Sequence, residues 1–122
     1  MIGKLVLEKT LNSPHVCGRI TAYAFLLDEG ANILITGGTR THVGAFSHAE
    51  PGRETETRQF PGHRDGVVSA RWAEVLCRLL DGPVSVECGI HFDGLSGEGI
   101  REVVKACGEM LEELCGCWTP LL

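Results

Sequence analysis

Residues 16–27 have the sequence VCGRITAYAFLL, in which small or apolar residues occupy every even-numbered position. These residues are Val16, Gly18, Ile20, Ala22, Ala24 and Leu26, whereas the odd-numbered positions carry a mixed set that includes Arg19 and Tyr23. Successive side chains of a β-strand point to opposite faces of its sheet. The stretch therefore predicts a long strand with one fully buried face and one face of mixed character.

The sequence on either side of this strand predicts further strands joined by short turns. A weaker alternation indicates a strand at residues 4–10, and residues 28–32 (DEGAN) have the composition of a hairpin loop. Strands are expected at 32–36 (NILIT) and 42–48 (HVGAFSH), with residues 37–41 connecting them. Because consecutive strands with short connections usually pair with each other, this part of the chain predicts an antiparallel meander.

The segment 50–62 (EPGRETETRQFPG) is the least hydrophobic part of the chain and contains two prolines and two glycines. We interpret it as a long surface loop. The pattern then changes to that of a helix from about residue 64 to residue 80. The apolar residues that share one face of this helix are Val68, Trp72, Val75, Leu76 and Leu79.

The last part of the chain predicts one more strand and one more helix. Residues 83–92 (PVSVECGIHF) alternate like a strand, and an apolar stripe marks a helix at about 98–115. Ser96 is its expected N-cap and Gly116 its expected end. The order β-β-β-β-α-β-α predicts an α+β fold, in which an antiparallel meander sheet of five strands carries both helices on one face.

The sheet face opposite the helices is predicted to be partly apolar. It would present Tyr23, Phe25 and Phe46 among polar residues such as Arg19 and Thr21. A face of this kind is rarely left in water. We therefore expect a second copy of the chain to cover it, so that the protein is a homodimer.

Composition limits the classes of protein that the chain can represent. A length of 122 residues with 43% hydrophobic residues predicts a single domain, 1–122. The chain has 11 Lys and Arg against 16 Asp and Glu, and this acidic balance argues against nucleic-acid and membrane partners. Charges at Lys4, Glu8 and Lys9 break the N-terminal apolar run, which argues against a signal peptide. We therefore expect a cytoplasmic protein whose cysteines are thiols.

Three connections between predicted elements combine glycine with histidine. They are residues 37–42 (GGTRTH), 62–65 (GHRD) and 89–94 (GIHFDG). Glycine permits close backbone approach, and histidine and arginine donate hydrogen bonds to an anion. The connections predict an anion pocket for a phosphate group. Arg64 and the N–H groups at the first helix start would hold the phosphate, and Arg40, His42 and His91 would line the rest.

Other chemistry is also compatible with these residues. His42, His63, His91 and Asp93 could together hold a metal ion in a small metal-dependent enzyme, although they form no short ligand motif. His91 and Asp93 share one face of a strand, as either an acid–base pair or a structural hydrogen bond. No serine lies in a G-x-S-x-G elbow, and Cys88 and His91 should face opposite sides, so the sequence gives little support to a nucleophilic catalytic site.

The three connections lie within longer motifs. These are TGGTRTHVGAF (36–46), FPGHRDGVVSARWAEVL (60–76) and VECGIHFDGLSGEGIREVV (86–104). In these motifs the chain resembles the LpdD-like family, small accessory proteins of UbiD-type decarboxylases described as prenylated flavin chaperones. The likeness runs from about residue 16 to residue 114. It implies a proteasome-assembly-chaperone-like α+β fold and a homodimer.

The resemblance also implies a function and a set of site residues. The protein would have a non-catalytic role: it would bind flavin mononucleotide (FMN), prenylated or unmodified, and deliver it to a UbiD-type decarboxylase. Residues that match the family motifs are Gly37, Gly38, His42 and Gly44, then Gly62, His63 and Arg64, then Gly89, Ile90, His91 and Asp93. Arg64 replaces a lysine, Gly94 replaces an asparagine, and Thr39 and Thr41 depart from the first motif. A protein-assembly chaperone without a small ligand is the alternative.

Overall fold

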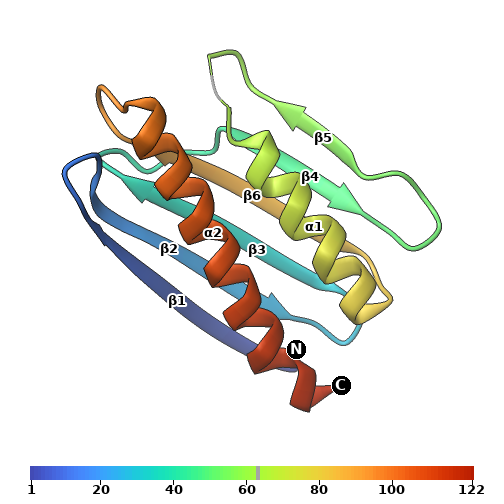
Figure 1. Cartoon of the computed structure of the whole chain (residues 1–122). Helices are drawn as coiled ribbons and strands as arrows, with labels where there is room; N and C mark the ends of the chain where they lie inside the picture. Colours follow the sequence, from blue (N-terminus) through green and yellow to red (C-terminus); the bar gives the residue numbers. More distant parts are fainter. Residues whose placement is uncertain (63) are drawn as a thin grey trace.

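The alternating stretch at 16–27 forms the second strand of a six-stranded sheet that carries two helices on one face (Figure 1). This computed structural model describes residues 1–62 and 64–122. The α+β class and the placement of both helices are therefore as the sequence predicts. The elements are β1 (Gly3–Asn12), β2 (Cys17–Leu26), β3 (Ala31–Gly38), β4 (Ala45–Ala49), β5 (Glu56–Gln59), α1 (Gly66–Leu80), β6 (Val84–His91), α2 (Gly97–Trp118) and the 3₁₀ turn η1 (Thr119–Leu121).

The sheet is mixed, so the prediction of a purely antiparallel meander is wrong. Its strand order is β1-β2-β3-β6-β4-β5, with β6 parallel to β3 and every other neighbouring pair antiparallel. The meander ends at β3, because β6 lies between β3 and β4. Val84, Val86 and Cys88 of β6 are completely buried, which suits a central strand and not an edge.

Several element boundaries also differ from the prediction. Part of the expected loop at 50–62 forms β5, whose four residues are all exposed at the sheet edge. The strand expected from His42 begins only at Ala45. Helix α2 continues through Gly116 to Trp118, because Trp118 packs into the core and holds the last turn in place. The predicted N-cap is confirmed, since Ser96 accepts a hydrogen bond from the Gly99 N–H at 3.1 Å.

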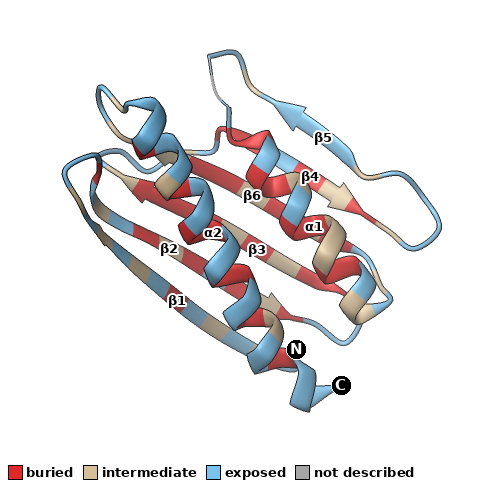
Figure 2. Cartoon of the chain, viewed as in Figure 1, coloured by how far each residue is buried: buried red, intermediate tan, exposed pale blue. Residues whose placement is uncertain are grey.

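The core lies between the helices and the sheet face that they cover (Figure 2). On β2 the core includes Ile20, Ala22, Ala24 and Leu26, which lie on the face that the sequence predicts to be buried. Trp72 and Leu76 of α1 and Met110 and Leu114 of α2 fill the opposite side and are at most 1% exposed. Burial of this apolar surface is the main stabilising contribution to the fold.

The opposite face of the sheet, here called the outer face, carries a row of partly apolar side chains. Strand register places Val6, Tyr23, Leu34, Glu87, Phe46 and Arg58 side by side across all six strands. Tyr23 and Phe46 are each 40% exposed. The expected apolar character of this face is therefore present in the structure.

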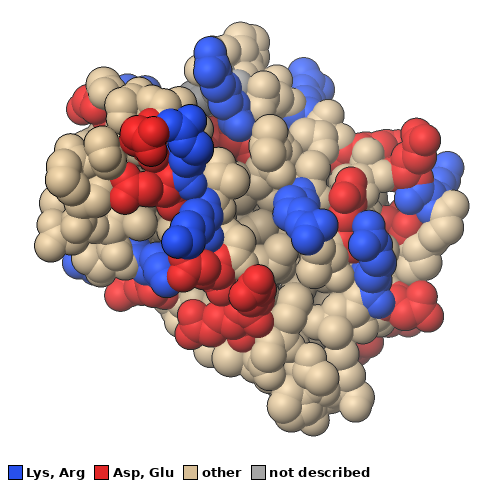
Figure 3. Space-filling view, viewed as in Figure 1, with Lys and Arg blue, Asp and Glu red and all other residues tan. Residues whose placement is uncertain are grey.

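On the helix face, acidic and basic side chains are interspersed (Figure 3). Within residues 1–62 and 64–122, no helix is both long and apolar enough to cross a membrane.

Candidate functional site

The described parts of the three glycine–histidine connections meet at one end of the sheet. Because β3 and β6 are parallel, their carboxyl ends lie side by side, and Gly38 pairs with His91. The segment 39–44 then runs along β6, with the Thr39 N–H donating to the His91 carbonyl at 2.7 Å and the Gly44 N–H to the Cys88 carbonyl at 2.9 Å. Helix α1 begins at this same end. The fold thus brings together segments that lie far apart in the sequence.

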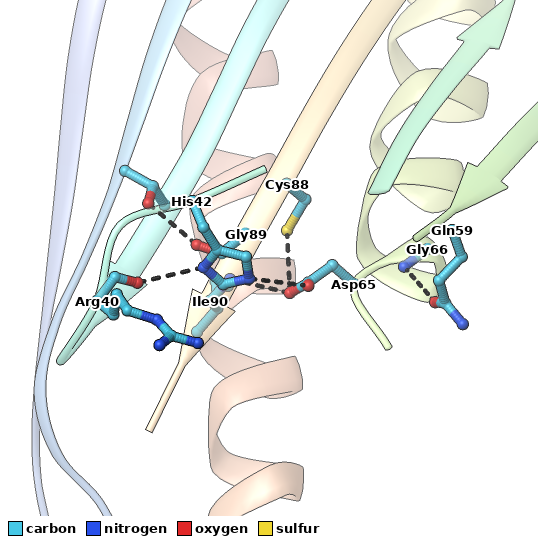
Figure 4. A network of polar contacts seen from close by, with 9 residues as sticks. Arg40, His42, Gln59, Asp65, Gly66, Cys88, Gly89 and Ile90 are labelled. Carbon is cyan, nitrogen blue, oxygen red and sulfur yellow. Dashed lines mark hydrogen bonds and ion pairs between the residues drawn. The ribbon is translucent and has the colours of Figure 1, made fainter. Parts of the chain in front are cut away.

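Asp65, the residue before α1, joins all three segments through a buried carboxylate (Figure 4). Its Oδ1 accepts a hydrogen bond from the Ile90 N–H at 2.9 Å and lies 3.9 Å from the Cys88 thiol. Its Oδ2 lies 3.6 Å from Nε2 of His42. The side chains of Asp65 and His42 are only 9% and 15% exposed. One carboxylate therefore fixes the start of α1, strand β6 and the segment 39–44 relative to one another.

The His42 ring lies between two hydrogen-bond acceptors. Its Nδ1 is 3.2 Å from the Arg40 carbonyl oxygen, and its Nε2 faces the Asp65 carboxylate. A carbonyl oxygen can only accept, so Nδ1 must donate in this contact. Both ring nitrogens of His42 therefore face acceptors within the protein.

His91 lies beside His42 at the more open side of the site. The two ring centroids are 6.4 Å apart, with the rings nearly perpendicular. Nε2 of His91 is 2.9 Å from Oδ1 of Asp93, so the prediction that these two residues share a face is confirmed. Two imidazoles and two carboxylates are thus held close together at this end of the sheet.

Glycines at the site permit close approach between chain segments. A Cβ on Gly44 would lie 2.0 Å from Oδ2 of Asp65, and one on Gly89 would lie 1.9 Å from the His42 carbonyl oxygen. Gly38 has φ +85°, and a Cβ there would lie 1.8 Å from the His91 carbonyl oxygen. A Cβ on Gly37 would lie 2.5 Å from the Arg19 carbonyl oxygen. Packing within the chain therefore requires glycine at these positions, against backbone atoms at Gly37, Gly38 and Gly89 and against the Asp65 side chain at Gly44.

The two arginines of the predicted anion pocket are exposed to solvent. Arg40 and Arg64 flank the buried cluster from the segments before β4 and before α1. The start of α1 offers less to an anion than the sequence predicts, because the Gly66 N–H already donates to Oε1 of Gln59 at 2.9 Å. The Asp65 carboxylate also lies at this helix start. Gly62 occupies a turn with φ +81°, and His63 lies outside the described residues.

The buried thiols near this site are poorly suited to nucleophilic chemistry. Burial first, and then the Asp65 carboxylate, raise the pKa of the Cys88 thiol far above its ordinary value. Burial raises the pKa of Cys107 to about 12. Both groups stay protonated at neutral pH, and a protonated thiol is a weak nucleophile. Among the described residues, no group of three or more His, Cys, Asp and Glu side chains is arranged to hold a metal ion.

Asp65 is the site residue to which sequence reasoning assigned no role. The signal available was an acidic residue that directly precedes a predicted helix, at the end of the Gly-His-Arg-Asp run. Such a residue is usually an exposed cap. In the structure its side chain caps no helix N–H and instead points into the cluster. Burial of this carboxylate depends on the approach of β6, which local sequence does not specify.

The overall architecture is that of a known class of assembly chaperones. The chain is similar to one chain of a chaperone complex for yeast 20S proteasome assembly, with a TM-score of 0.55 over 93% of this chain and 98% of that chain. The sequence identity is 11%, so this likeness concerns the fold alone. The expected proteasome-assembly-chaperone-like fold is confirmed.

Sequence comparison identifies the family. The model of the prenylated flavin chaperone LpdD-like domain matches residues 17–118, and the chain belongs to this family. The chain is also 29% identical over 87 residues to protein LpdD of Lactiplantibacillus plantarum. That alignment covers 67% of this chain and 61% of the relative, so the chain spans less than two thirds of the length of this curated relative.

Proposed function

We propose that the protein is a non-catalytic accessory protein that binds FMN, prenylated or unmodified, and delivers it to a UbiD-type decarboxylase. The observation that carries this proposal is the family match together with the converged end of the sheet. There, Asp65 holds the glycine–histidine segments in contact, and those segments are the ones that resemble the family motifs.

The donor groups at this end suit the phosphate of FMN. Arg40 and Arg64 can each offer a charged fork of N–H donors. Exposed arginines bind phosphate in the presence of water, so the interaction is weaker than in a closed pocket. Moderate affinity suits a carrier, because a carrier has to release its ligand to the enzyme that uses it.

Replacement of Arg64 by alanine is expected to weaken FMN binding about 5- to 30-fold, which corresponds to one charge-assisted hydrogen bond. Binding of riboflavin, which has no phosphate, should be unchanged. Flavin fluorescence titration measures both affinities. Arg78→Ala, at the opposite end of α1, is the matched control and should bind FMN like the wild type. An unchanged FMN affinity in Arg64→Ala would remove this residue from the site.

We further propose that the protein is a homodimer in which a second copy covers the outer face. The support is the row of side chains defined above, in which Val6, Tyr23 and Phe46 are each at least 40% exposed. Large exposed apolar side chains on one sheet face, here with Glu87 and Arg58 in the same row, are typical of a protein–protein interface.

A charge at the centre of this row should separate the two copies. Tyr23→Glu is expected to halve the mass measured by light scattering after size exclusion, because a carboxylate would be buried without a partner. The exposed side chain makes the same change tolerable in a single copy. Val67→Glu, at a position on α1 that is 71% exposed, is the control and should leave the mass unchanged. A wild-type protein with the mass of one chain would refute the dimer.

The alternative function is that of a protein-assembly chaperone without a small ligand. The exposed apolar side chains of the outer face favour it, because they suit a protein partner as well as a second copy. A dimer that binds neither FMN nor prenylated FMN would support this alternative. The other alternative, a metal-dependent enzyme, is tested by elemental analysis of the purified protein. A content below ~0.1 metal ion per chain would refute it.

A further inference from the structure

A hollow of about 250 Å³ lies beside the converged end of the sheet, between the β1–β2 turn and the segment that follows β6. Its walls include Val16 and Cys17 from the β1–β2 turn and the start of β2, Phe92 and Leu95 from the segment after β6, and Thr39 from the segment after β3. Phe92 is packed against the backbone of Gly18, where a Cβ would come within 2.6 Å of the aromatic ring. The aromatic wall is therefore held in place by the strand beside it.

This hollow adjoins the histidines through two residues. Asp93 lines the hollow and also contacts Nε2 of His91 at 2.9 Å. Thr39 lines it too, and its hydroxyl donates to the His91 carbonyl oxygen at 3.3 Å. A ligand that entered the hollow would thus lie next to His91, whose ring is 6.4 Å from that of His42.

The size and chemistry of the hollow indicate which part of a ligand it can take. Pockets that enclose a whole drug-sized ligand usually measure roughly 300–1,000 Å³, so this one suits only part of a nucleotide. Its aromatic and aliphatic walls suit a flat ring. The Asp93 carboxylate would repel a phosphate but can accept a hydrogen bond from a ring N–H.

We propose that this hollow binds the ring system of the flavin, while the phosphate lies towards Arg40 and Arg64. The inference rests on the proposed function, since it assigns a place to one part of the same ligand. Asp93 would accept from the N–H of the ring's pyrimidine edge, and Phe92 would pack against the ring. The histidines would lie between the two ends of the ligand.

Cys17 lines the hollow and is an exposed cysteine, which allows a direct test on the unmodified protein. Cys117 is also exposed but lies in the last turn of α2, so it serves as an internal control. The rate of alkylation by N-ethylmaleimide is followed for each cysteine by peptide mass spectrometry. With FMN at ten times its Kd, the rate at Cys17 should fall roughly tenfold, because about a tenth of the protein is then free. Cys117 should react at an unchanged rate.

Two further probes separate the ring from the phosphate. Riboflavin at the same multiple of its own Kd should protect Cys17, and inorganic phosphate should not. Saturation with FMN, established by fluorescence, without protection of Cys17 would overturn the assignment and leave the proposed function intact. Equal protection of Cys17 and Cys117 would also overturn it. Absence of any FMN binding would instead overturn the proposed function.

A pair of tryptophan substitutions provides an independent measurement. Cys17→Trp places a large side chain at the wall and is expected to weaken FMN and riboflavin equally, by at least tenfold. Arg64→Ala should weaken the binding of FMN but not that of riboflavin, so the two variants should differ in which ligand they bind less tightly. Cys117→Trp is the matched control, and circular dichroism melting shows whether each variant is folded. Unchanged riboflavin affinity in a folded Cys17→Trp would overturn the assignment.

Discussion

Gly89→Ala is expected to lower the free energy of unfolding by about 2–4 kcal/mol and to abolish FMN binding. The new Cβ would lie 1.9 Å from the carbonyl oxygen of His42 and 3.2 Å from the backbone nitrogen of Gly44, so the segment 42–44 has to move away from β6. This movement would break the hydrogen bond from the Gly44 N–H to the Cys88 carbonyl, which is 2.9 Å long. Overpacking costs about 1–3 kcal/mol and a lost hydrogen bond about 1 kcal/mol.

The matched control for this variant is Gly108→Ala. Gly108 lies within α2, and an added Cβ would meet no atom within 4 Å. Alanine is the better helix former, so this variant should gain about 0.5–1 kcal/mol. Urea unfolding followed by circular dichroism measures both changes. A Gly89→Ala protein as stable as the wild type would mean that the segment 42–44 does not pack against β6 as described.

Removal of the Asp65 side chain is expected to produce the second large effect. Asp65→Ala leaves the buried Ile90 N–H without its acceptor at 2.9 Å and His42 without the carboxylate at 3.6 Å. The expected loss in the free energy of unfolding is about 2–4 kcal/mol, because the Ile90 N–H loses its acceptor and the contact between the carboxylate and His42 is removed. Asp65→Asn keeps an acceptor for the Ile90 N–H, so its free energy of unfolding should fall only about half as far as that of Asp65→Ala.

Binding distinguishes a positioning role for Asp65 from a merely structural one. In Asp65→Asn an amide group replaces the carboxylate that faces Nε2 of His42, so the segment 39–44 is held less firmly and we expect FMN affinity to fall several-fold in a protein that remains folded at room temperature. Asp81→Asn replaces an exposed aspartate at the other end of α1, in a left-handed conformation that asparagine tolerates. It should change neither stability nor binding. Wild-type affinity in Asp65→Asn would limit Asp65 to a role in stability.

Local patterns predict most elements of this fold but not the order of its strands. The alternation at 16–27 predicts β2 and its buried face, and the apolar stripes predict α1 and α2. Strand order depends on which edges meet after the helices have packed, and nothing within residues 83–92 specifies β3 and β4 as neighbours. Strand β5 has four exposed residues, and a side-chain link to β4 is a polar contact of 2.7 Å between the hydroxyls of Thr57 and Ser47, so the strand leaves no hydrophobic signal in the sequence.

For the site, the sequence predicts which segments form it more accurately than it predicts the contact that each residue makes. Glycine beside histidine marks the connections that the structure brings together at one end of the sheet. The sequence does not reveal that Gly44 leaves room for the Asp65 carboxylate, because this contact joins residues from two separate connections. It also cannot show that the Gly66 N–H, expected to face an anion, is occupied by Gln59.

The insertion of β6 between β3 and β4 has a consequence for synthesis of the protein on the ribosome. The hairpins β1–β2–β3 and β4–β5 can form as they emerge, but they share no paired edge until β6 has been made. The acceptor contacts of Asp65 with Cys88 and Ile90 likewise wait for this strand. A nascent chain shorter than about 91 residues therefore lacks the candidate site. Binding of a ligand would report that β6 has been synthesised and has paired with both β3 and β4.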